Sequence, residues 1–166
     1  MSEPPKEPVR YIDSTLYLPY DYVAGDLKAL YLRALKDKKI LGSKCSVTGK
    51  VFAPPILASP ESFAPCNELV EVSDHGVMTT FCVVNIPVIG RDLELPYVAS
   101  SVALDGADIS IFALIKGVKP EQARMGMRVR AVWKPDAERT GSHDDILHFE
   151  PTGEPDAPLE SFSHRL

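Results

Sequence analysis

The chain has 166 residues, of which 45% are hydrophobic and 25% are charged. These proportions are typical of one folded domain and exclude a largely disordered chain, and the absence of any run of about 20 apolar residues excludes a membrane span. The net charge of −5 gives the chain no general attraction for phosphate backbones, which disfavours a general nucleic-acid binder.

Residues 1–42 are predicted to form an extended arm followed by one helix. Four prolines among the first 20 residues favour an extended arm. The apolar side chains of this arm either pack on a partner or fold back on the chain's own domain; they are Leu16, Tyr17, Leu18 and Tyr20.

A helix is predicted over residues 21–39, because apolar side chains recur there at nearly 3.6-residue spacing. Asp26 is expected to cap its first turn and Gly42 to end it. A lone amphipathic helix needs a surface to cover, which is either its own domain or a partner. The apolar face consists of Leu27, Leu30, Tyr31 and Leu35.

Residues 43–67 form a segment rich in turn residues, with one cysteine near each end and two consecutive prolines in the middle. Residues 50–52 are predicted to be a short hairpin strand that follows the turn residues Thr48 and Gly49. We expect this segment to be a small unit of its own.

Alternation with period two starts at residue 68 and predicts strands rather than helices. After a short strand at 68–73, five strands are predicted, at 76–87, 95–104, 109–115, 127–134 and 146–151. A short helical turn at 120–124 falls between the third and fourth of these five, which is the order of an OB-fold barrel. The predicted fold is therefore mainly β, with the barrel over 68–151 and a tail over 152–166.

Candidate catalytic residues are few. The strand at 76–87 is apolar on both faces, so we expect it deep in the closed sheet, with Cys82 as a packed core thiol rather than a nucleophile. No serine nucleophile elbow, phosphate loop or dinucleotide fingerprint is present, so we expect no catalytic residues. One polar cluster lies in a predicted loop and is expected to be solvated rather than catalytic; it consists of His143, Asp144, Asp145 and His148.

Five segments of the chain carry a specific series of motifs, which reads KC-x-x-T-G, PP, GVMTTF, LDGA and GMRVRAVW in chain order. The segments are residues 30–55, 76–87, 96–109, 126–135 and 149–158. Together they cover most of the chain from residue 30 on. They resemble the acyl-CoA-associated OB-fold proteins, a family of formerly unassigned domains that combine an N-terminal helical arm, a rubredoxin-like zinc ribbon and an OB-fold.

The resemblance implies a small subunit that does no chemistry alone and associates with thiolases, hydroxymethylglutaryl-CoA synthases or lipid-transfer-type thiolase homologues. It also implies that the OB-fold helps to hold the CoA thioester, or completes and shields the partner's active site. The lipid-transfer-type partners cleave side-chain acyl-CoA by retro-aldol chemistry in steroid catabolism, so the resemblance suggests a role in lipid metabolism.

The zinc ribbon is where this sequence departs from the family pattern. A structural zinc site uses four nitrogen or sulfur ligands, usually from two C-x-x-C knuckles. The first knuckle here is Cys45-Ser-Val-Thr48, and the second is Phe63-Ala-Pro-Cys66 or Cys66-Asn-Glu-Leu69, so each keeps one cysteine. We expect no cofactor and a ribbon that keeps its hairpin shape without metal, the alternative being zinc held by an incomplete ligand set. A disulfide between the remaining cysteines is disfavoured in a reducing compartment.

Basic residues concentrate between residues 115 and 140, where the sequence has seven basic residues and three acidic ones. Such a group suits the phosphates of CoA, an acidic partner surface or a nucleic-acid backbone, or else is an ordinary solvated face. The candidates for CoA phosphate contact are Arg124, Arg128 and Lys116. The candidates for partner contact are Leu16, Tyr17, Tyr20, Leu27, Leu30 and Tyr31.

The function that we expect is a non-catalytic auxiliary subunit of a thiolase-like acyl-CoA enzyme, with acyl-CoA in a shared site. The alternative is an OB-fold nucleic-acid-binding protein, which needs a basic groove with stacking aromatic side chains. The aromatic residues of the predicted barrel mostly alternate onto core faces, which weakens that alternative. An odd number of cysteines and a polar start without an apolar signal sequence favour the cytoplasm.

Overall fold

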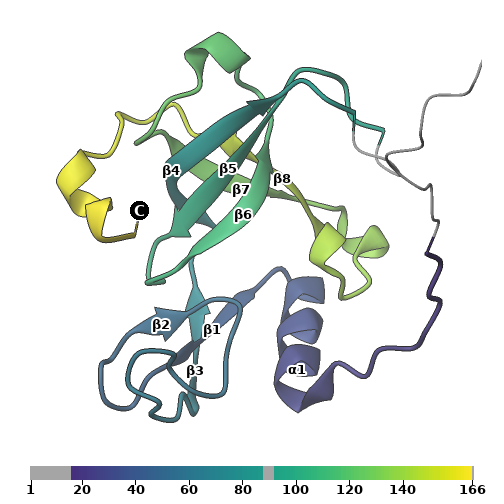
Figure 1. Ribbon diagram of the computed structural model, residues 1–166, viewed down its shortest axis with the longest axis vertical. Helices are drawn as coiled ribbons and strands as arrows, with labels where there is room; N and C mark the ends of the chain where they lie inside the picture. Colours follow the sequence, from purple (N-terminus) through teal and green to yellow (C-terminus); the bar gives the residue numbers. More distant parts are fainter. Residues whose placement is uncertain (1–15, 88–91, 166) are drawn as a thin grey trace, which may run out of the picture.

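Two β-sheets and one α-helix make up the part of the chain that the structure describes, residues 16–87 and 92–165 of a computed structural model (Figure 1). The helix α1 (Gly25–Lys36) and a three-stranded sheet lie side by side at one end, and a β-barrel forms the other end. No helix within these two ranges is long and apolar enough to cross a membrane. The first 15 residues of the predicted arm lie outside the described residues.

Helix α1 is shorter than expected at both ends. Its N-cap is Ala24, with no side-chain cap, and Asp26 lies inside the first turn, so the capping role predicted for Asp26 is wrong. The helix ends because Lys38 adopts a left-handed conformation (φ 60°), with the Lys38 and Lys39 amides bonded back to Leu35 and Ala34. This is a Schellman motif, and it stops the helix well before Gly42.

The three-stranded sheet has the order β2-β1-β3, all antiparallel, and consists of β1 (Ile40–Lys44), β2 (Val51–Phe52) and β3 (Glu68–Val72). Gly42 lies in β1, where a Cβ atom would be only 2.8 Å from Val51 Cγ1, so glycine lets the neighbouring strand approach. The strand predicted at 68–73 exists as β3, but it pairs with β1 along its whole length. The barrel therefore begins one strand later than the expected 68–151 range.

The barrel is closed in the order β4-β5-β6-β8-β7, with β4 pairing back onto β7. All neighbouring pairs are antiparallel except β6 and β8, which are parallel. A single 3-10 turn, η1 (Pro120–Gln122), lies between β6 and β7. This topology confirms the mainly β, OB-fold prediction. The strands are β4 (His75–Val84), β5 (Tyr97–Leu104), β6 (Ser110–Ile115), β7 (Arg128–Trp133) and β8 (Ile146–Pro151).

One hydrophobic core joins the helix, the small sheet and the barrel. Tyr31 and Leu35 of α1 and Ile40 of β1 belong to the same buried cluster as the barrel side chains Met78 and Phe149. The inner face of α1 is therefore covered by its own chain, which settles one alternative left open by the sequence. Leu30, predicted on that face, is exposed, and Leu27 is only partly buried.

The outer half of β4 contradicts the expected deep burial. β4 pairs with β7 only over His75–Val77 but with β5 as far as Val84, so its second half has one neighbouring strand. Residues 80–83 are accordingly exposed, and Cys82 is an exposed thiol rather than a packed core thiol. The apolar side chains on both faces of β4 therefore belong to a hairpin of β4 and β5 that projects from the barrel, and not to a central strand.

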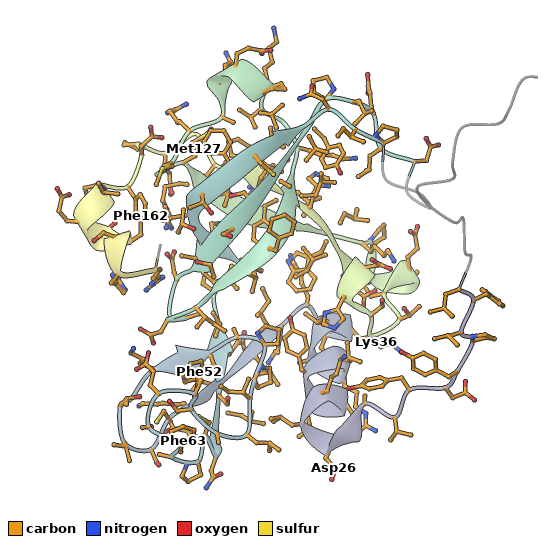
Figure 2. The ribbon with its side chains drawn as sticks, viewed as in Figure 1. Asp26, Lys36, Phe52, Phe63, Met127 and Phe162 are labelled. Carbon is orange, nitrogen blue, oxygen red and sulfur yellow. The ribbon has the colours of Figure 1, made fainter. Side chains whose placement is uncertain are left out.

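The C-terminal tail packs against the barrel through two 3-10 turns, η4 (Leu159–Ser161) and η5 (Ser163–Arg165). Phe162, between them, is buried on the side of the molecule where Met127 lies (Figure 2). The Ala157 amide donates to the Gly126 carbonyl over 2.8 Å, and Arg165 Nη1 donates to the Leu104 carbonyl over 3.3 Å. The tail is thus an integral part of the fold.

Candidate functional site

The small sheet brings Cys45 and Cys66 together inside a ribbon-like unit. Both thiols are buried and pack with Phe52. Cys45 Sγ lies 3.4 Å from Ser62 Oγ and accepts a hydrogen bond of 3.4 Å from the Thr48 amide. Hydrogen bonds from Ser62, and then from Thr48, lower the pKa of Cys45 to about 6. Burial, and then the charge of Cys45, raise the pKa of Cys66.

The ligand set of this ribbon does not fit a structural zinc ion. Of the four knuckle positions, only Cys45 and Cys66 offer sulfur, and Thr48 offers a neutral hydroxyl. The fourth position is either Phe63, which is 86% exposed in an outer loop, or Leu69 in β3, and neither side chain can bind a metal. Phe52, in contrast to Phe63, lies within the sheet (Figure 2). Within residues 16–87 and 92–165, no three His, Cys, Asp or Glu side chains are grouped closely enough to hold a metal ion.

Protein contacts account for the ribbon's shape instead. Ser43 Oγ donates to the Ile56 carbonyl over 2.8 Å and accepts from the Ile56 amide over 2.9 Å, which ties β1 to the following loop. Asp108, in the loop between β5 and β6, accepts from the Val51 amide through its carboxylate and donates to the Val51 carbonyl through its own amide. These bonds connect the ribbon both to itself and to the barrel.

Two of the three residues predicted to contact CoA phosphate are engaged by carboxylates. Arg124 makes a bidentate ion pair with Asp156 in the tail, with its Nη2 2.9 Å from Asp156 Oδ1. Arg128 bonds to both oxygens of Asp105, at 2.8 and 2.6 Å, and also contacts Glu154. The hydrogen bonds to Asp105 raise the pKa of the already cationic Arg128 guanidinium further. Arg124 is therefore neutralised by the tail, and Arg128 is neutralised mainly by Asp105 between β5 and β6, with Glu154 of the tail beside it.

Lys116, the third predicted phosphate contact, lies at the end of β6 near His148. Burial of His148, and then the charge of Lys116, lower the pKa of the His148 imidazole, so this ring is neutral at pH 7. Lys116 thus belongs to the β6–β8 side of the barrel, whereas Arg124 is paired with Asp156 of the tail and Arg128 with Asp105.

The predicted solvated loop is more ordered than expected. The Asp145 carboxylate is fully buried and accepts three backbone amides, from Thr140, Gly141 and Ser142, at 2.7–3.1 Å. Burial opposes its charge, but these hydrogen bonds outweigh the burial and lower the pKa of Asp145. Asp145 ends the 3-10 turn η3 (His143–Asp145), which places the His143 ring 5.7 Å from the ring of Tyr31.

The segment before α1 exposes a run of large hydrophobic side chains. Their exposed fractions range from 65 to 88%, so these side chains do not fold back onto the chain's own domain. Figure 1 shows this segment as an extended stretch that leads away from α1. The run, here called the apolar arm, consists of Leu16, Tyr17, Leu18, Tyr20, Tyr22 and Val23.

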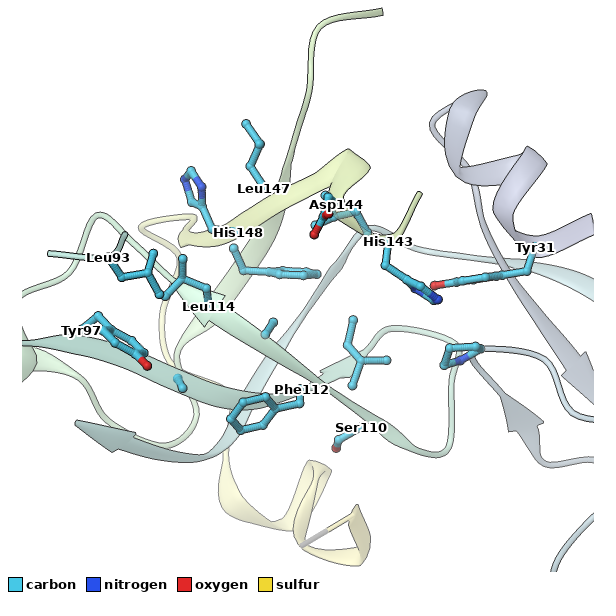
Figure 3. A pocket seen from close by; sticks show the side chains of 16 residues that line it. Tyr31, Leu93, Tyr97, Ser110, Phe112, Leu114, His143, Asp144, Leu147 and His148 are labelled. Atoms are coloured by element: carbon cyan, nitrogen blue, oxygen red, sulfur yellow. The ribbon is translucent and has the colours of Figure 1, made fainter. Parts of the chain in front are cut away.

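A pocket of about 670 Å³ opens between β6 and β8, next to the N-terminal part of the molecule (Figure 3). The rings of Tyr31 and His143 lie at one end of it, and Leu93 and Tyr97 lie at the other end. Phe112 and Ser110 of β6 line its floor in this view. From the sequence, Tyr31 was expected on the apolar face of the helix and in partner contact, and Ser110, Phe112 and Tyr97 carried no signal as site residues.

Comparison with known proteins relates the barrel to one family. Residues 69–134 match the family described as ChsH2, C-terminal OB-fold domain. The chain also resembles the solved structure "Ltp2-ChsH2(DUF35) aldolase", with 22% identity and a TM-score of 0.57 over 75% of this chain and 93% of that one.

A second solved structure, a protein of unknown function from the DUF35 family of Sulfolobus solfataricus, shares 19% identity with a TM-score of 0.54 over 65% of this chain and 78% of that one. No curated protein matches the chain. At these identities, the two structural likenesses establish a shared fold.

Proposed function

Because residues 69–134 match the ChsH2 C-terminal OB-fold domain family, we propose that this chain is the non-catalytic partner subunit of a lipid-transfer-type, thiolase-like acyl-CoA enzyme. The similar chain in the Ltp2-ChsH2(DUF35) aldolase supports a partner of this kind. In its most specific form, the proposal is a subunit of a retro-aldolase of steroid side-chain degradation, working in the cytoplasm.

The apolar arm is the observation that carries the proposal. Six large hydrophobic side chains within eight residues stay exposed in the chain alone. Monomeric soluble proteins rarely leave such a concentration of apolar surface uncovered. Burying one side chain of this kind contributes about 1.5–3 kcal/mol, so a partner that covered several of them would be held firmly.

A non-catalytic role for the subunit is supported by the contacts of Cys45 and Asp145, two groups whose pKa is lowered. Cys45 bonds to Ser62 and Thr48 inside the ribbon, and Asp145 bonds to the amides of its own loop. Both groups therefore have structural partners. The catalytic residues are expected in the partner enzyme.

Of the three candidate residues, Lys116 is the one that we expect to contact the CoA phosphates. Arg124 and Arg128 must give up their carboxylate partners before they can meet a phosphate, and two charge-assisted bonds are lost in each exchange. In the shared site that we propose, both arginines therefore keep their carboxylate partners while Lys116 contacts acyl-CoA.

Co-purification tests the proposal. The tagged chain is expressed with candidate lipid-transfer-type, thiolase-like enzymes in turn, and any complex is weighed by native mass spectrometry and assayed for acyl-CoA turnover. A hetero-oligomer that turns over substrate when neither chain does alone is the expected result. A chain that stays alone with every thiolase-like candidate, or binds single-stranded nucleic acid instead, would overturn it.

Substitutions in the apolar arm locate the contact. The triple variant Leu16→Ser, Tyr17→Ser, Tyr20→Ser should abolish complex formation without changing the fold, because these side chains are exposed in the free chain. Leu57→Ser is the matched control, since Leu57 is 76% exposed but lies in the ribbon, and it should leave the complex intact.

A further inference from the structure

The ribbon packs the cysteines Cys45 and Cys66 into one small cluster. Both side chains are buried against Phe52, in a group of residues separate from the main core. The Ser46 amide donates to the Pro65 carbonyl over 3.1 Å, so the chain neighbours of the two cysteines are joined directly. The two sulfur atoms therefore face the same interior, although they come from opposite ends of the ribbon.

The two thiols interact with each other and differ in acidity. Hydrogen bonds from Ser62, and then from Thr48, lower the pKa of Cys45 to about 6, so Cys45 is mainly a thiolate at pH 7. Burial, then the charge of Cys45 and a side-chain hydrogen bond with it, raise the pKa of Cys66, which stays a protonated thiol. A reactive thiolate beside a second thiol is the arrangement in which cysteine oxidation ends in a disulfide.

Only a thin cover separates Cys45 from solvent. Cys45 is itself 1% exposed, but the turn that follows it, residues 46–49, is exposed throughout. The Ser62 hydroxyl, 3.4 Å from Cys45 Sγ, belongs to a second surface loop, in which Phe63 is 86% exposed. Exposed turns open locally at a much lower free-energy cost than core strands. A hydroperoxide is little larger than water, so a brief opening of either segment admits it to the thiolate.

We propose that Cys45 and Cys66 form a reversible redox site, in which a hydroperoxide converts the two thiols into one disulfide. The Cys45 sulfur attacks one peroxide oxygen and the O–O bond breaks, which leaves a sulfenic acid on Cys45 and, after protonation by solvent, one water molecule. The Cys66 sulfur then attacks the sulfenic sulfur, its proton passes to the departing hydroxyl group, and a second water leaves. In total, two thiols and one hydrogen peroxide give one disulfide and two water molecules.

The site is a sensor rather than a permanent cross-link. Disulfides in a reducing compartment are usually transient, and exchange with a cellular thiol returns the two cysteines to the reduced state. The redox site needs no partner enzyme, so it stands apart from the proposed function.

Peroxide treatment of the full chain tests the proposal. The protein carries Cys82→Ser, which removes the exposed thiol and leaves the ribbon pair. The reduced protein is treated with hydrogen peroxide at pH 7, quenched with catalase, denatured with an alkylating reagent and weighed. The expected product is a monomer that has lost two hydrogen atoms, takes up no alkyl group, and regains both thiols on reduction. Two free thiols after excess peroxide, or disulfide-linked dimers instead of this product, would overturn the proposal.

Two single-thiol proteins assign the roles of the cysteines, each made by adding one substitution to Cys82→Ser. Cys66→Ser should stop at the sulfenic acid of Cys45, which dimedone traps. Cys45→Ser should react far more slowly, because the thiol of Cys66 is protonated. Faster trapping on Cys66 than on Cys45 would refute Cys45 as the attacking residue. Should either variant fail to fold, the measurement on the paired thiols still decides whether the site exists.

The pH dependence identifies the attacking group without any further substitution. Disulfide formation in Cys82→Ser should become about tenfold faster between pH 5 and pH 7, as the Cys45 thiolate forms, and should then level off. A rate that keeps rising as far as pH 9 would show attack by an ordinary thiol and would contradict the assignment.

Discussion

Replacing the buried carboxylate of Asp145 by an amide should destabilise the protein by about 2–3 kcal/mol. Oδ2 of Asp145 accepts from the Gly141 and Ser142 amides, and Oδ1 accepts from the Thr140 amide. An asparagine keeps one acceptor oxygen, so Asp145→Asn retains the first pair and turns an NH₂ group toward the Thr140 amide. The variant then loses one charge-assisted hydrogen bond, which is worth about 1.5–3 kcal/mol. Repulsion between the new NH₂ group and the Thr140 amide, two donors that face each other, adds to this cost.

The assay is urea unfolding at several pH values, followed by the fluorescence of Trp133. The native pKa of Asp145 is lowered, so the carboxylate's contribution is complete above the ordinary value of 3.8 and is lost as the pH falls through the lower native value. The stability gap between wild type and Asp145→Asn should therefore be constant from pH 7 to about 5 and should shrink in stronger acid. Glu138→Gln, an exposed carboxylate in the same loop region, is the control and should change stability by less than about 0.5 kcal/mol.

Two results would refute this reasoning. A gap below about 0.5 kcal/mol at pH 7 would mean that the three amides do not depend on the charge. A gap that stays constant down to the acid transition would mean that the variant acts through packing, since only the charge titrates.

Three further predictions concern the thiols, the ribbon and the strand contact at Gly42. Cys82 is the exposed thiol, so a disulfide reagent should label one cysteine rapidly in the native protein and none in Cys82→Ser; rapid labelling of Cys45 would contradict its burial. A zinc chelator should leave the melting temperature unchanged, because the ligand set does not fit the metal, and a large fall would show a metal-dependent ribbon. Gly42→Ala should cost about 1–3 kcal/mol in urea unfolding, because its Cβ would lie 2.8 Å from Val51 Cγ1 and 3.0 Å from the Phe52 carbonyl; a neutral result would mean that β2 moves freely.

The barrel could be predicted because its strands carry their own evidence. Alternation with period two locates β5 to β8 within a residue or two, and a turn between the third and fourth barrel strands specifies the topology. Pairing is different, because a strand's own pattern does not name its neighbour. β3 has the same local character as a barrel strand, yet it pairs with β1.

The helix ends and the burial of β4 show what local rules miss. Asp26 and Gly42 are typical cap residues, but Lys38 takes the left-handed position that a glycine usually fills. Apolar side chains on both faces of β4 were compatible with a central strand and with a projecting hairpin, and only the limited pairing with β7 decides between them.

The pocket between β6 and β8 had only a partial signal in the sequence, because His143, Asp144 and His148 of the polar cluster line it but most of its walls do not stand out in the sequence. Its walls come from α1, β5, β6 and β8, so Tyr31 and His143 meet across more than a hundred residues of chain. The apolar arm, by contrast, could be predicted, because a short run of aromatic and aliphatic residues among prolines is visible without any tertiary information.

The position of β8 determines when the barrel can form during protein synthesis. β8 is the last strand made, yet it lies between β6 and β7 and supplies the Phe149 side chain to the core. Until residues 146–151 have left the ribosome, β6 and β7 have no strand to join them, and Arg124 has not yet met its partner Asp156. Barrel closure therefore has to wait for residues 146–151, and until they are available the chain exposes the edges of β6 and β7 and the apolar interior between them.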